Sequence, residues 1–400
     1  MANLALALLR GIAVFFINPI FYLLVCGLFL FSAQRVRRER RSFRVKAYGM
    51  FNTIFRSIAP SLITGLCGSV VLIGLGVSLK PGVFVLLTGC YLIVMLSTQL
   101  RFLSPAIAGG LTLLLAYFLP PIRTSSALLN QWMTDIRTVN MVSLGIFLAV
   151  ALLSECLLVY VWGVRQSSPR LINSRRGGRV GAHEASQLWI VPLFALVPSA
   201  GPVSSFAAWP LIHGSGTGFG FLLFPIGVGL AQLITYALPV RAVRSTGHWL
   251  LLTACGFILC TVLALWLEMP VLVVLGGLLA LISRLALLVH HHHLRKTRPF
   301  YFTQPNQGVR VIGVIPHSPV ERMGIKPGEE ILKVNDQVIK NEYEFYEALQ
   351  KNLAYCKLEV VDRFGEPRFA KGSVHEGDGH RIGLLFLESD NWKYDTKTEA

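Results

Sequence analysis

The sequence predicts an all-α polytopic membrane helix bundle of about eight or nine spans, followed by a small β-rich soluble domain. Composition is the first reason: 53% of the 400 residues are hydrophobic and 14% are charged, whereas soluble domains average about 45–50% and about 25%. The second reason is the distribution of charge. Residues 1–298 carry 24 Lys/Arg and 5 Asp/Glu, net +19, whereas residues 299–400 carry 13 and 16, net −3. The two regions therefore suit different solvents.

Apolar runs long enough to cross a bilayer are the third observation. A spanning helix needs about 20 apolar residues. Asn18-Pro19 interrupts the first such run, so in an alternative arrangement residues 2–17 lie in the membrane interface, leaving eight spans and the N-terminus inside. The nine predicted spans are 10–32, 60–79, 82–100, 102–120, 141–163, 188–212, 216–240, 249–267 and 271–289.

Basic residues predict the orientation of these spans. With the N-terminus outside, the inner segments hold 19 Lys/Arg and the outer segments hold three, Lys80, Arg123 and Arg137. Lys and Arg concentrate in cytoplasmic loops, so the soluble domain is expected in the cytoplasm of a multi-pass protein of the cell membrane. The predicted organisation is a multi-span domain (1–289), a basic juxtamembrane linker (290–298), a folded domain (299–388) and a disordered tail (389–400).

A short segment after the first span concentrates seven basic residues. It has three interpretations: a topology signal, a protein-binding segment, or a lipid-facing segment attracted to anionic membrane lipid at about 1 kcal/mol per charge. The Lys/Arg of the chain lie between apolar runs and form no stripe on a soluble fold, so no nucleic-acid partner is expected. The seven residues are Arg35, Arg37, Arg38, Arg40, Arg41, Arg44 and Lys46.

Two ionisable residues fall inside predicted spans. Glu155 lies near the middle of span five and Arg284 lies in span nine. Such residues are candidates for function by default. A proton or ion path needs several such groups in series, so we interpret these two as an intramembrane ion pair. Exchanging the two charges is expected to restore what each single substitution loses.

Two segments partly match enzyme signatures, and neither contains a complete one. The segment His183-Glu184-Ala-Ser-Gln187 lacks the second histidine of the His-Glu-x-x-His zinc motif. The segment His213-Gly-Ser215-Gly216 falls in a predicted outer turn, with no histidine at that depth on another helix. The seven cysteines include no Cys-x-x-Cys pair. The sequence therefore predicts no catalytic residue, no metal and no cofactor.

Residues 308–336 carry the strongest local motif. It combines a strand, Ser318-Pro319 opening a one-turn helix, a Gly-x-x-x-Gly turn, a second strand and an Asn335-Asp336 hairpin turn. Asn341 then begins a helix, with Glu344 at the capping-box position. This order and spacing resemble a bacterial PDZ domain over about 80–90 residues. The motif reads Val309-Arg-Val-Ile-Gly-Val-Ile-Pro-His-Ser-Pro-Val-Glu-Arg-Met-Gly-Ile-Lys-Pro-Gly-Glu-Glu-Ile-Leu-Lys-Val-Asn-Asp336.

The PDZ resemblance implies peptide binding by strand addition beside a helix. The apolar-Gly-apolar loop that binds a ligand carboxylate is expected near the C-terminus, so the domain is interpreted as circularly permuted, with strand 382–387 facing helix 342–351. The alternative is that 382–387 is simply a closing strand. A bulky residue at position 383 is expected to weaken partner recruitment. The predicted peptide-binding residues are Arg381, Ile382, Gly383, Leu384, Leu385, Phe386, Tyr343, Tyr346 and Glu347.

The whole chain also resembles a family. Many spans, no catalytic residues, one short-tethered C-terminal domain, the opening Leu8-Leu-Arg10-Gly-Ile and the basic run are similar to the MinJ family of Gram-positive topological determinants of cell division. The resemblance implies a non-catalytic scaffold at septum and poles that bridges a DivIVA-type scaffold and MinD. Two alternatives stay open: a transporter or sensor with a regulatory PDZ domain, and an intramembrane protease.

Overall fold

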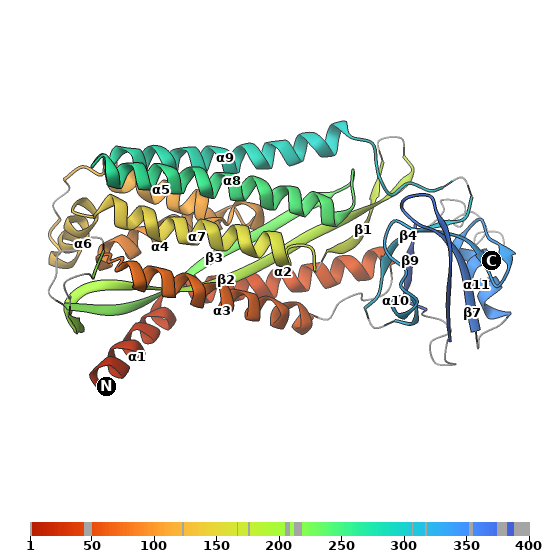
Figure 1. Cartoon of the computed structure of the whole chain (residues 1–400), viewed down its shortest axis with the longest axis horizontal. Helices are drawn as coiled ribbons and strands as arrows, with labels where there is room; N and C mark the ends of the chain where they lie inside the picture. Colours follow the sequence, from red (N-terminus) through yellow and green to blue (C-terminus); the bar gives the residue numbers. More distant parts are fainter. Residues whose placement is uncertain are drawn as a thin grey trace.

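The computed structural model describes most of the chain as a long helical part followed by a smaller β-rich domain (Figure 1). The described residues are 2–43, 50–121, 124–165, 167–174, 177–204, 209–211, 218–305, 307–316, 318–351, 355–373 and 382–387. The elements of the first part are α1 (Ala2–Ile17), α2 (Pro19–Phe43), α3 (Met50–Leu75), α4 (Pro81–Leu96), η1 (Leu100–Phe102), α5 (Pro105–Phe118), α6 (Ala127–Arg137), α7 (Met141–Trp162), β1 (Ser168–Asn173), β2 (Arg179–Ser204), β3 (Gly218–Ile234), α8 (Pro239–Trp266) and α9 (Val271–Thr297).

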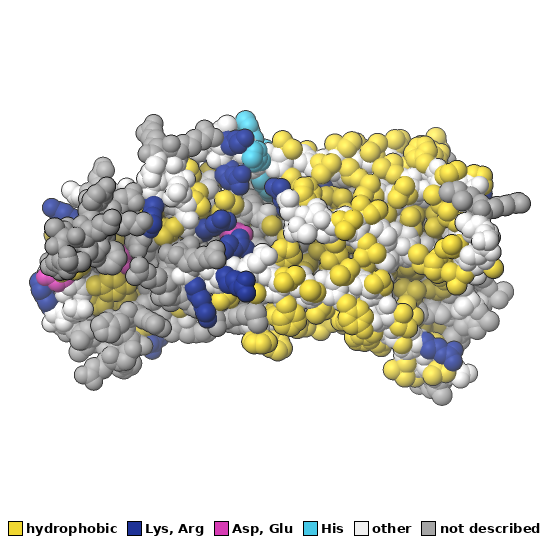
Figure 2. All heavy atoms as spheres, turned by 180° about the vertical axis from the view of Figure 1, so that it is seen from behind, with side chains coloured by type: hydrophobic (Ala, Val, Ile, Leu, Met, Phe, Trp, Pro, Cys, Tyr) yellow, Lys and Arg dark blue, Asp and Glu magenta, His cyan; other side chains and the backbone are white. Residues whose placement is uncertain are grey.

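Five of these helices are long and apolar enough to cross a membrane: α2, α3, α7, α8 and α9. Helices α1, α4 and α5 are apolar but shorter, at 16, 16 and 14 residues. On the face that Figure 2 shows, hydrophobic side chains cover much of this part, and Lys and Arg gather where that hydrophobic surface ends. These features are those of a membrane-associated chain.

The all-α prediction for this part is wrong. Residues 188–212 and 216–240, predicted as two spanning helices, contain most of strands β2 and β3, which form an antiparallel hairpin along the helical part (Figure 1). β1 adds a third strand at the end nearest the soluble domain. The predicted linker 290–298 is helical over nearly its whole length, because α9 continues without a break to Thr297.

The residue pattern of the hairpin explains why it is not helical. Val191, Leu193 and Ala195 are fully buried, whereas the even-numbered residues between them are half-buried. This alternation has the period of a strand. Pro192 and Pro225, which would each interrupt a helix, face each other across the hairpin. Neither proline can donate an N–H to its partner, so the position is a non-hydrogen-bonded pair and the prolines leave no donor at the outer edges.

The outer edge of β2 is closed by α3 and the residues that follow it. In an apolar environment an unpaired backbone N–H costs several kcal/mol. The Phe194 N–H donates to Ser69 Oγ at 2.9 Å, and the Leu196 N–H donates to the Val77 carbonyl at 3.2 Å. Gly65 of α3 lies so near Pro192 that an added Cβ would be 2.4 Å from the Pro192 carbonyl oxygen. Helix and strand are therefore in backbone contact.

The outer edge of β3 is closed by three other elements. The Gly229 N–H donates to the Leu103 carbonyl at 2.7 Å, just after η1. The Gly229 carbonyl accepts from Arg284 Nη2 of α9 at 3.2 Å, and the Gly227 carbonyl accepts from the Tyr91 hydroxyl of α4 at 3.3 Å. The Leu103 carbonyl and side chains of α4 and α9 thus make the hydrogen bonds that another strand, paired along this edge of β3, would otherwise make.

The soluble domain is built on one curved sheet. Its strand order is β8-β7-β5-β4-β9, with β6 paired to β5. A separate hydrophobic core fills the space between this sheet and α11, with Phe345, Ile331 and Leu358 fully buried. The elements are β4 (Val309–Val314), α10 (Pro319–Arg322), β5 (Glu330–Val334), β6 (Gln337–Val338), α11 (Glu342–Gln350), β7 (Tyr355–Val361), β8 (Pro367–Ser373) and β9 (Leu384–Phe386).

The local signals predicted for this domain are confirmed. Ser318 Oγ accepts from the Glu321 N–H at the start of α10, and Asn341 Oδ1 accepts from the Glu344 N–H at the start of α11. Asn335 and Asp336 both have positive φ, as the predicted hairpin turn requires. These signals act between near neighbours, so they do not depend on how the domain packs.

Candidate functional site

Strand β9 and helix α11 are the two elements between which the PDZ resemblance expects a peptide to bind, and we call them the candidate peptide-binding groove. β9 pairs antiparallel with β4, with Val314 opposite Leu384 and Val311 opposite Phe386. The Phe386 ring centroid lies 4.9 Å from that of Phe345 and 6.4 Å from that of Tyr346, so α11 packs beside β9. This is the arrangement needed for adding an extended peptide next to a helix.

The two edges of the sheet differ in their capacity to pair. β9 has one strand neighbour among the described residues, and its three residues are Leu384, Leu385 and Phe386. β8, at the opposite edge, begins with Pro367 and carries an exposed Lys371. Proline and lysine are the residues that discourage edge-to-edge pairing. The composition therefore favours β9 as the edge that accepts another chain.

The predicted groove residues occupy different positions. Tyr343 is 66% exposed and Glu347 is also exposed, so both lie at the open rim of α11. Tyr346 is half-buried, and burial together with the nearby Glu342 raises the pKa of Tyr346 to about 12. Its hydroxyl therefore stays protonated and can donate a hydrogen bond. Ile382, Leu384, Leu385 and Phe386 are buried, and Arg381 lies outside the described residues.

Gly383 contributes to the fold of the domain, in addition to its place in the predicted ligand-binding loop. Its φ is +95°, and its carbonyl accepts from the Ile315 N–H at 2.8 Å. An added Cβ would lie 2.1 Å from Ser318 Cβ. A bulky residue at this position would therefore disturb the fold of the domain, so it cannot report on peptide binding alone.

The C-terminal β-rich domain is attached to the β2–β3 hairpin by β-structure. Gly181 of β2 forms an antiparallel bridge with Phe302, and its N–H donates to the Phe302 carbonyl at 2.9 Å. The Tyr301 N–H donates to the Thr235 carbonyl at 2.8 Å, just beyond β3. Gly313 of β4 lies close enough to Pro169 of β1 that an added Cβ would be 2.9 Å from Pro169 Cγ. The domain is therefore docked on the end of the hairpin.

His183 is a buried, titratable residue of this attachment and lies outside the apolar stretch of β2. Its Nε2 lies 2.8 Å from the Ile312 carbonyl oxygen of β4, and its ring centroid lies 5.0 Å from that of Phe302. Desolvation by burial lowers the pKa of His183 to about 4, and the Ile312 hydrogen bond opposes this shift only in part. The neutral ring, with Nε2 donating to Ile312, is therefore the docked form.

The attachment is expected to weaken in mild acid. The folded pKa lies below the ordinary value of 6.5, so the undocked or unfolded state binds more protons between these values, and stability is lost as the pH falls from about 6.5 towards 4. The full loss of stability of the docked state is about 3 kcal/mol. The His183→Gln variant keeps a donor for Ile312 but cannot titrate. Proteolysis between the two domains at pH 7 and 5 should accelerate in the wild type and not in His183→Gln. Equal acceleration of proteolysis in the wild type and in His183→Gln would contradict this role. The control variant is His293→Gln, which changes a histidine at an exposed position.

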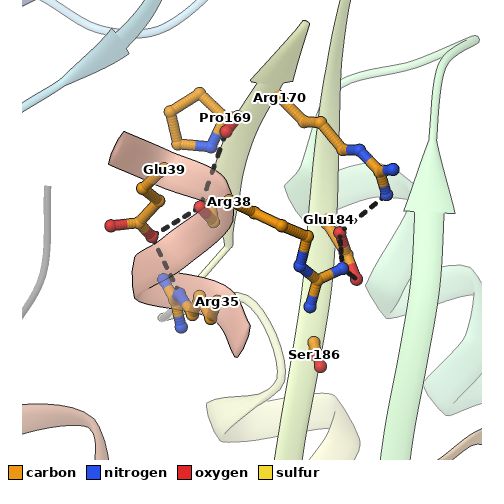
Figure 3. Close-up of a pocket in the computed structure, with 8 residues that line it drawn as sticks. Arg35, Arg38, Glu39, Pro169, Arg170, Glu184 and Ser186 are labelled. Atoms are coloured by element: carbon orange, nitrogen blue, oxygen red, sulfur yellow. Dashed lines mark hydrogen bonds and ion pairs between the residues drawn. The ribbon is translucent and has the colours of Figure 1, made fainter. Parts of the chain in front are cut away.

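The basic segment on α2 makes specific ion pairs with the same strands (Figure 3). Arg38 Nη1 donates to both carboxylate oxygens of Glu184 at 2.6 and 2.7 Å, and Arg170 Nη1 donates to the second oxygen at 3.1 Å. Arg35 Nε donates to Glu39 Oε1 at 3.0 Å, and both side chains are buried. Arg35 and Arg38 therefore face protein carboxylates, which corrects the interpretation of these two as lipid-facing. Arg37 and Arg40 are exposed, and the side chains of Arg41, Arg44 and Lys46 lie outside the described residues.

The two predicted intramembrane residues lie together. Arg284 Nη2 is 3.2 Å from Glu155 Oε1, and both side chains are almost fully buried. Glu155 Oε2 also accepts from the Ser104 hydroxyl at 2.7 Å. Because Arg284 donates to Gly229 as well, the pair joins α7, α9 and the segment before α5 to the edge of the hairpin.

Several residues of these networks were not found from the sequence. Ser69, Tyr91 and Ser104 lie in apolar runs as single polar residues, and such residues also occur without a specific partner. Pro192 and Pro225 were available signals, because two prolines at matching distances from a turn favour a hairpin over two helices. Glu184 was another signal, since it is one of five carboxylates in a strongly basic region.

No group of three or more His, Cys, Asp or Glu that could hold a metal occurs among the described residues. His183 and Glu184 are occupied by the contacts above. The segment His213-Gly-Ser215-Gly216 lies outside the described residues.

Curated proteins resemble this chain over nearly its whole length. No protein-family model matches the chain. A cell division topological determinant, MinJ of Bacillus subtilis, is 31% identical over 384 residues, covering 96% of each chain. Probable cell division topological determinants MinJ of Lacticaseibacillus paracasei and Lacticaseibacillus casei are each 26% identical over 380 residues, covering 94% of this chain and 97% of theirs.

Proposed function

The chain belongs to the MinJ family of cell division topological determinants, and on this premise we propose that it is a non-catalytic, multi-pass membrane scaffold that positions division-site regulators at septum and poles. The observation that supports this most is the place of β9 at the end of the strand order beside α11: within the described part of the chain its only strand partner is β4, and its three residues are uncharged. Such an edge captures an extended segment of a partner through backbone hydrogen bonds. We further propose that the domain is a circularly permuted PDZ domain in the cytoplasm.

The proposed partners follow from the family. They are a DivIVA-type polar scaffold and MinD, and the attachment of the groove to the membrane hairpin supports this role. A domain docked at the membrane surface presents its groove at high effective concentration to membrane-associated partners. Tyr343 and Glu347 at the rim would contact ligand side chains, while β9 would supply backbone groups.

A transporter or sensor is the alternative within the membrane-associated part. A conducting path needs polar groups in series. Glu155 and Arg284 instead engage each other and the hairpin edge, which supports a structural role for the pair. The contacts of His183 and Glu184 likewise support a non-catalytic protein.

The test is septum placement in cells whose only copy of the gene is altered. Deleting residues 299–400 should give minicells or long undivided filaments. The double variant Tyr343→Arg, Glu347→Arg should reproduce much of this defect, because it adds charge and bulk at the groove rim. The matched control is Phe364→Arg, Glu366→Arg, which changes an exposed aromatic and an exposed acid at the distant β7–β8 turn.

Normal septa in the deletion strain would contradict the scaffold, and a transport or proteolytic defect there would favour its rivals. Equal defects in the rim variant and the control would contradict the groove. Correct membrane insertion of both variants should be shown by their yield in the membrane fraction.

A further inference from the structure

Five exposed cations gather where α8 begins and α9 ends. Arg241 and Arg244 lie near the start of α8, Arg295 and Lys296 lie in the last turns of α9, and Arg101 belongs to η1. They come from three segments that are far apart in the sequence. We call these five residues the α8–α9 cationic cluster.

Contacts between α8 and α9 show that the cations on these two helices lie at the same height along the helix axes. Thr246 Oγ1 of α8 lies 3.1 Å from His291 Nε2 of α9. The helices are consecutive and antiparallel (Figure 1), so advancing about one and a half turns on each brings Arg241 level with Lys296. The exposed His292 lies within electrostatic range of Arg101 as well as of its own helix's Arg295 and Lys296. The five cations therefore share one region of the surface.

The cluster has no acidic partner within the described part of the chain. None of the ion pairs there involves any of the five. The basic residues of the neighbouring β1–α2 region differ in this respect, because Arg38 and Arg170 both pair with Glu184. Gathering like charges without counter-charges is unfavourable, so the region suits an anion supplied from outside the protein.

The surroundings specify what kind of anion. Trp249 is 38% exposed and stacks on His290, with ring centroids 6.0 Å apart. Tryptophan at the end of an apolar helix face is typical of the membrane–water boundary. Figure 2 shows Lys and Arg gathered beside the histidines where the hydrophobic surface ends. Exposed apolar residues such as Leu252 and Leu279 continue that surface away from the cluster. A suitable occupant has a phosphate at one end and alkyl chains at the other.

We propose that the α8–α9 cationic cluster binds the phosphate headgroup of an anionic phospholipid whose chains lie along α8 and α9. Cations near the membrane surface attract acidic lipids additively. The cluster thus anchors the helix pair that carries Arg284 and leads directly into the soluble domain. It is a different place from the α2 segment, where Arg35 and Arg38 are committed to Glu39 and Glu184.

The experiment uses the full chain in nanodiscs of phosphatidylcholine, into which phosphatidylglycerol is titrated while retained lipid is counted by native mass spectrometry. The test variant is Arg241→Gln, Arg244→Gln, Lys296→Gln. The matched control, Lys326→Gln, Lys340→Gln, Arg363→Gln, removes three exposed cations from the C-terminal β-rich domain. We expect phosphatidylglycerol affinity to fall about tenfold or more in the test variant and less than about threefold in the control.

Three results would overturn the proposal: equal losses in the two variants, equal retention of phosphatidylcholine and phosphatidylglycerol by the wild type, or full displacement of phosphatidylglycerol by millimolar inorganic phosphate, which would indicate a small-anion site. If the test variant folds poorly, Arg241→Lys, Arg244→Lys keeps the charge. That variant must retain lipid within about threefold of the wild type, and a loss comparable to that of the glutamine variant would also contradict the proposal.

Discussion

Exchanging Glu155 and Arg284 will not restore the stability that either single substitution removes. Arg284→Met leaves a buried carboxylate without its cation, and Glu155→Leu leaves the reverse; each should cost about 3–5 kcal/mol. In the exchanged chain, a carboxylate at position 284 would face the Gly229 carbonyl, and a guanidinium at position 155 would face the Ser104 hydroxyl. Two acceptors would then meet, so the strand edge would lose its donor. The contacts with Gly229 and Ser104 therefore predict the opposite of what is expected for a simple ion pair.

The measurement is the thermal unfolding midpoint and folded yield of the full chain in detergent. The apolar double variant Glu155→Leu, Arg284→Met should be more stable than either single variant, because removing both charges avoids an unpaired one. Exchange of the exposed pair Glu347 and Lys351, whose charged atoms are 3.9 Å apart, is the control and should change little. A wild-type midpoint after exchange of Glu155 and Arg284 would show that the Gly229 contact is dispensable.

Gly383→Ala should destabilise the soluble domain well beyond the cost of its backbone conformation. A non-glycine residue with positive φ costs about 1–2 kcal/mol. At Gly383 the new Cβ would also meet Ser318 Cβ at 2.1 Å, and overpacking of this kind adds about 1–3 kcal/mol. Gly365 is a matched control, because its φ of +88° is similar to the +95° of Gly383 and nothing lies within 4 Å of its Cβ position.

Hydrogen exchange of the β4 and β9 amides in the full chain gives the readout. Protection there should fall much more in Gly383→Ala than in Gly365→Ala. Similar protection in the two variants would mean that Ser318 moves aside without cost, and position 383 would then become usable for probing the groove.

The soluble domain was largely predictable because its signals are local. Ser318, the Asn335-Asp336 turn and Asn341 act on backbone groups within three residues of themselves. The pairing of β9 with β4 is non-local and was not predicted. Only the position of strand 382–387 opposite helix 342–351 was inferred, through a resemblance of the Gly383 loop to that of a known domain.

The hairpin was not predictable by the same reasoning. Hydropathy measures the free energy of moving a segment out of water and is nearly blind to its backbone conformation, so residues 188–240 satisfied the criterion for spanning helices. The choice between two helices and two strands depends on distant partners, namely Ser69, Val77, Leu103 and Arg284. The ion pair of Glu155 with Arg284 was predictable from the sequence, because two charges in an apolar region have few other partners. Which arginine of α2 meets Glu184 depends on how that helix lies against β1 and β2, and no local pattern encodes it.

The closed edges of the hairpin also dictate an order of biogenesis. A hydrophobic helix satisfies its own backbone and can enter the bilayer as soon as it is synthesised, but β2 or β3 alone would carry bare amides into lipid. In a multi-pass chain of the kind we propose, the two strands are therefore expected to enter the bilayer together, against an α3 already in place, since Ser69 and Val77 precede them. Arg284 is translated some fifty residues after Gly229. Until α9 emerges, the far edge of the hairpin lacks its last donor, so we expect the nascent chain to be held by the insertion machinery and released only when its final span arrives.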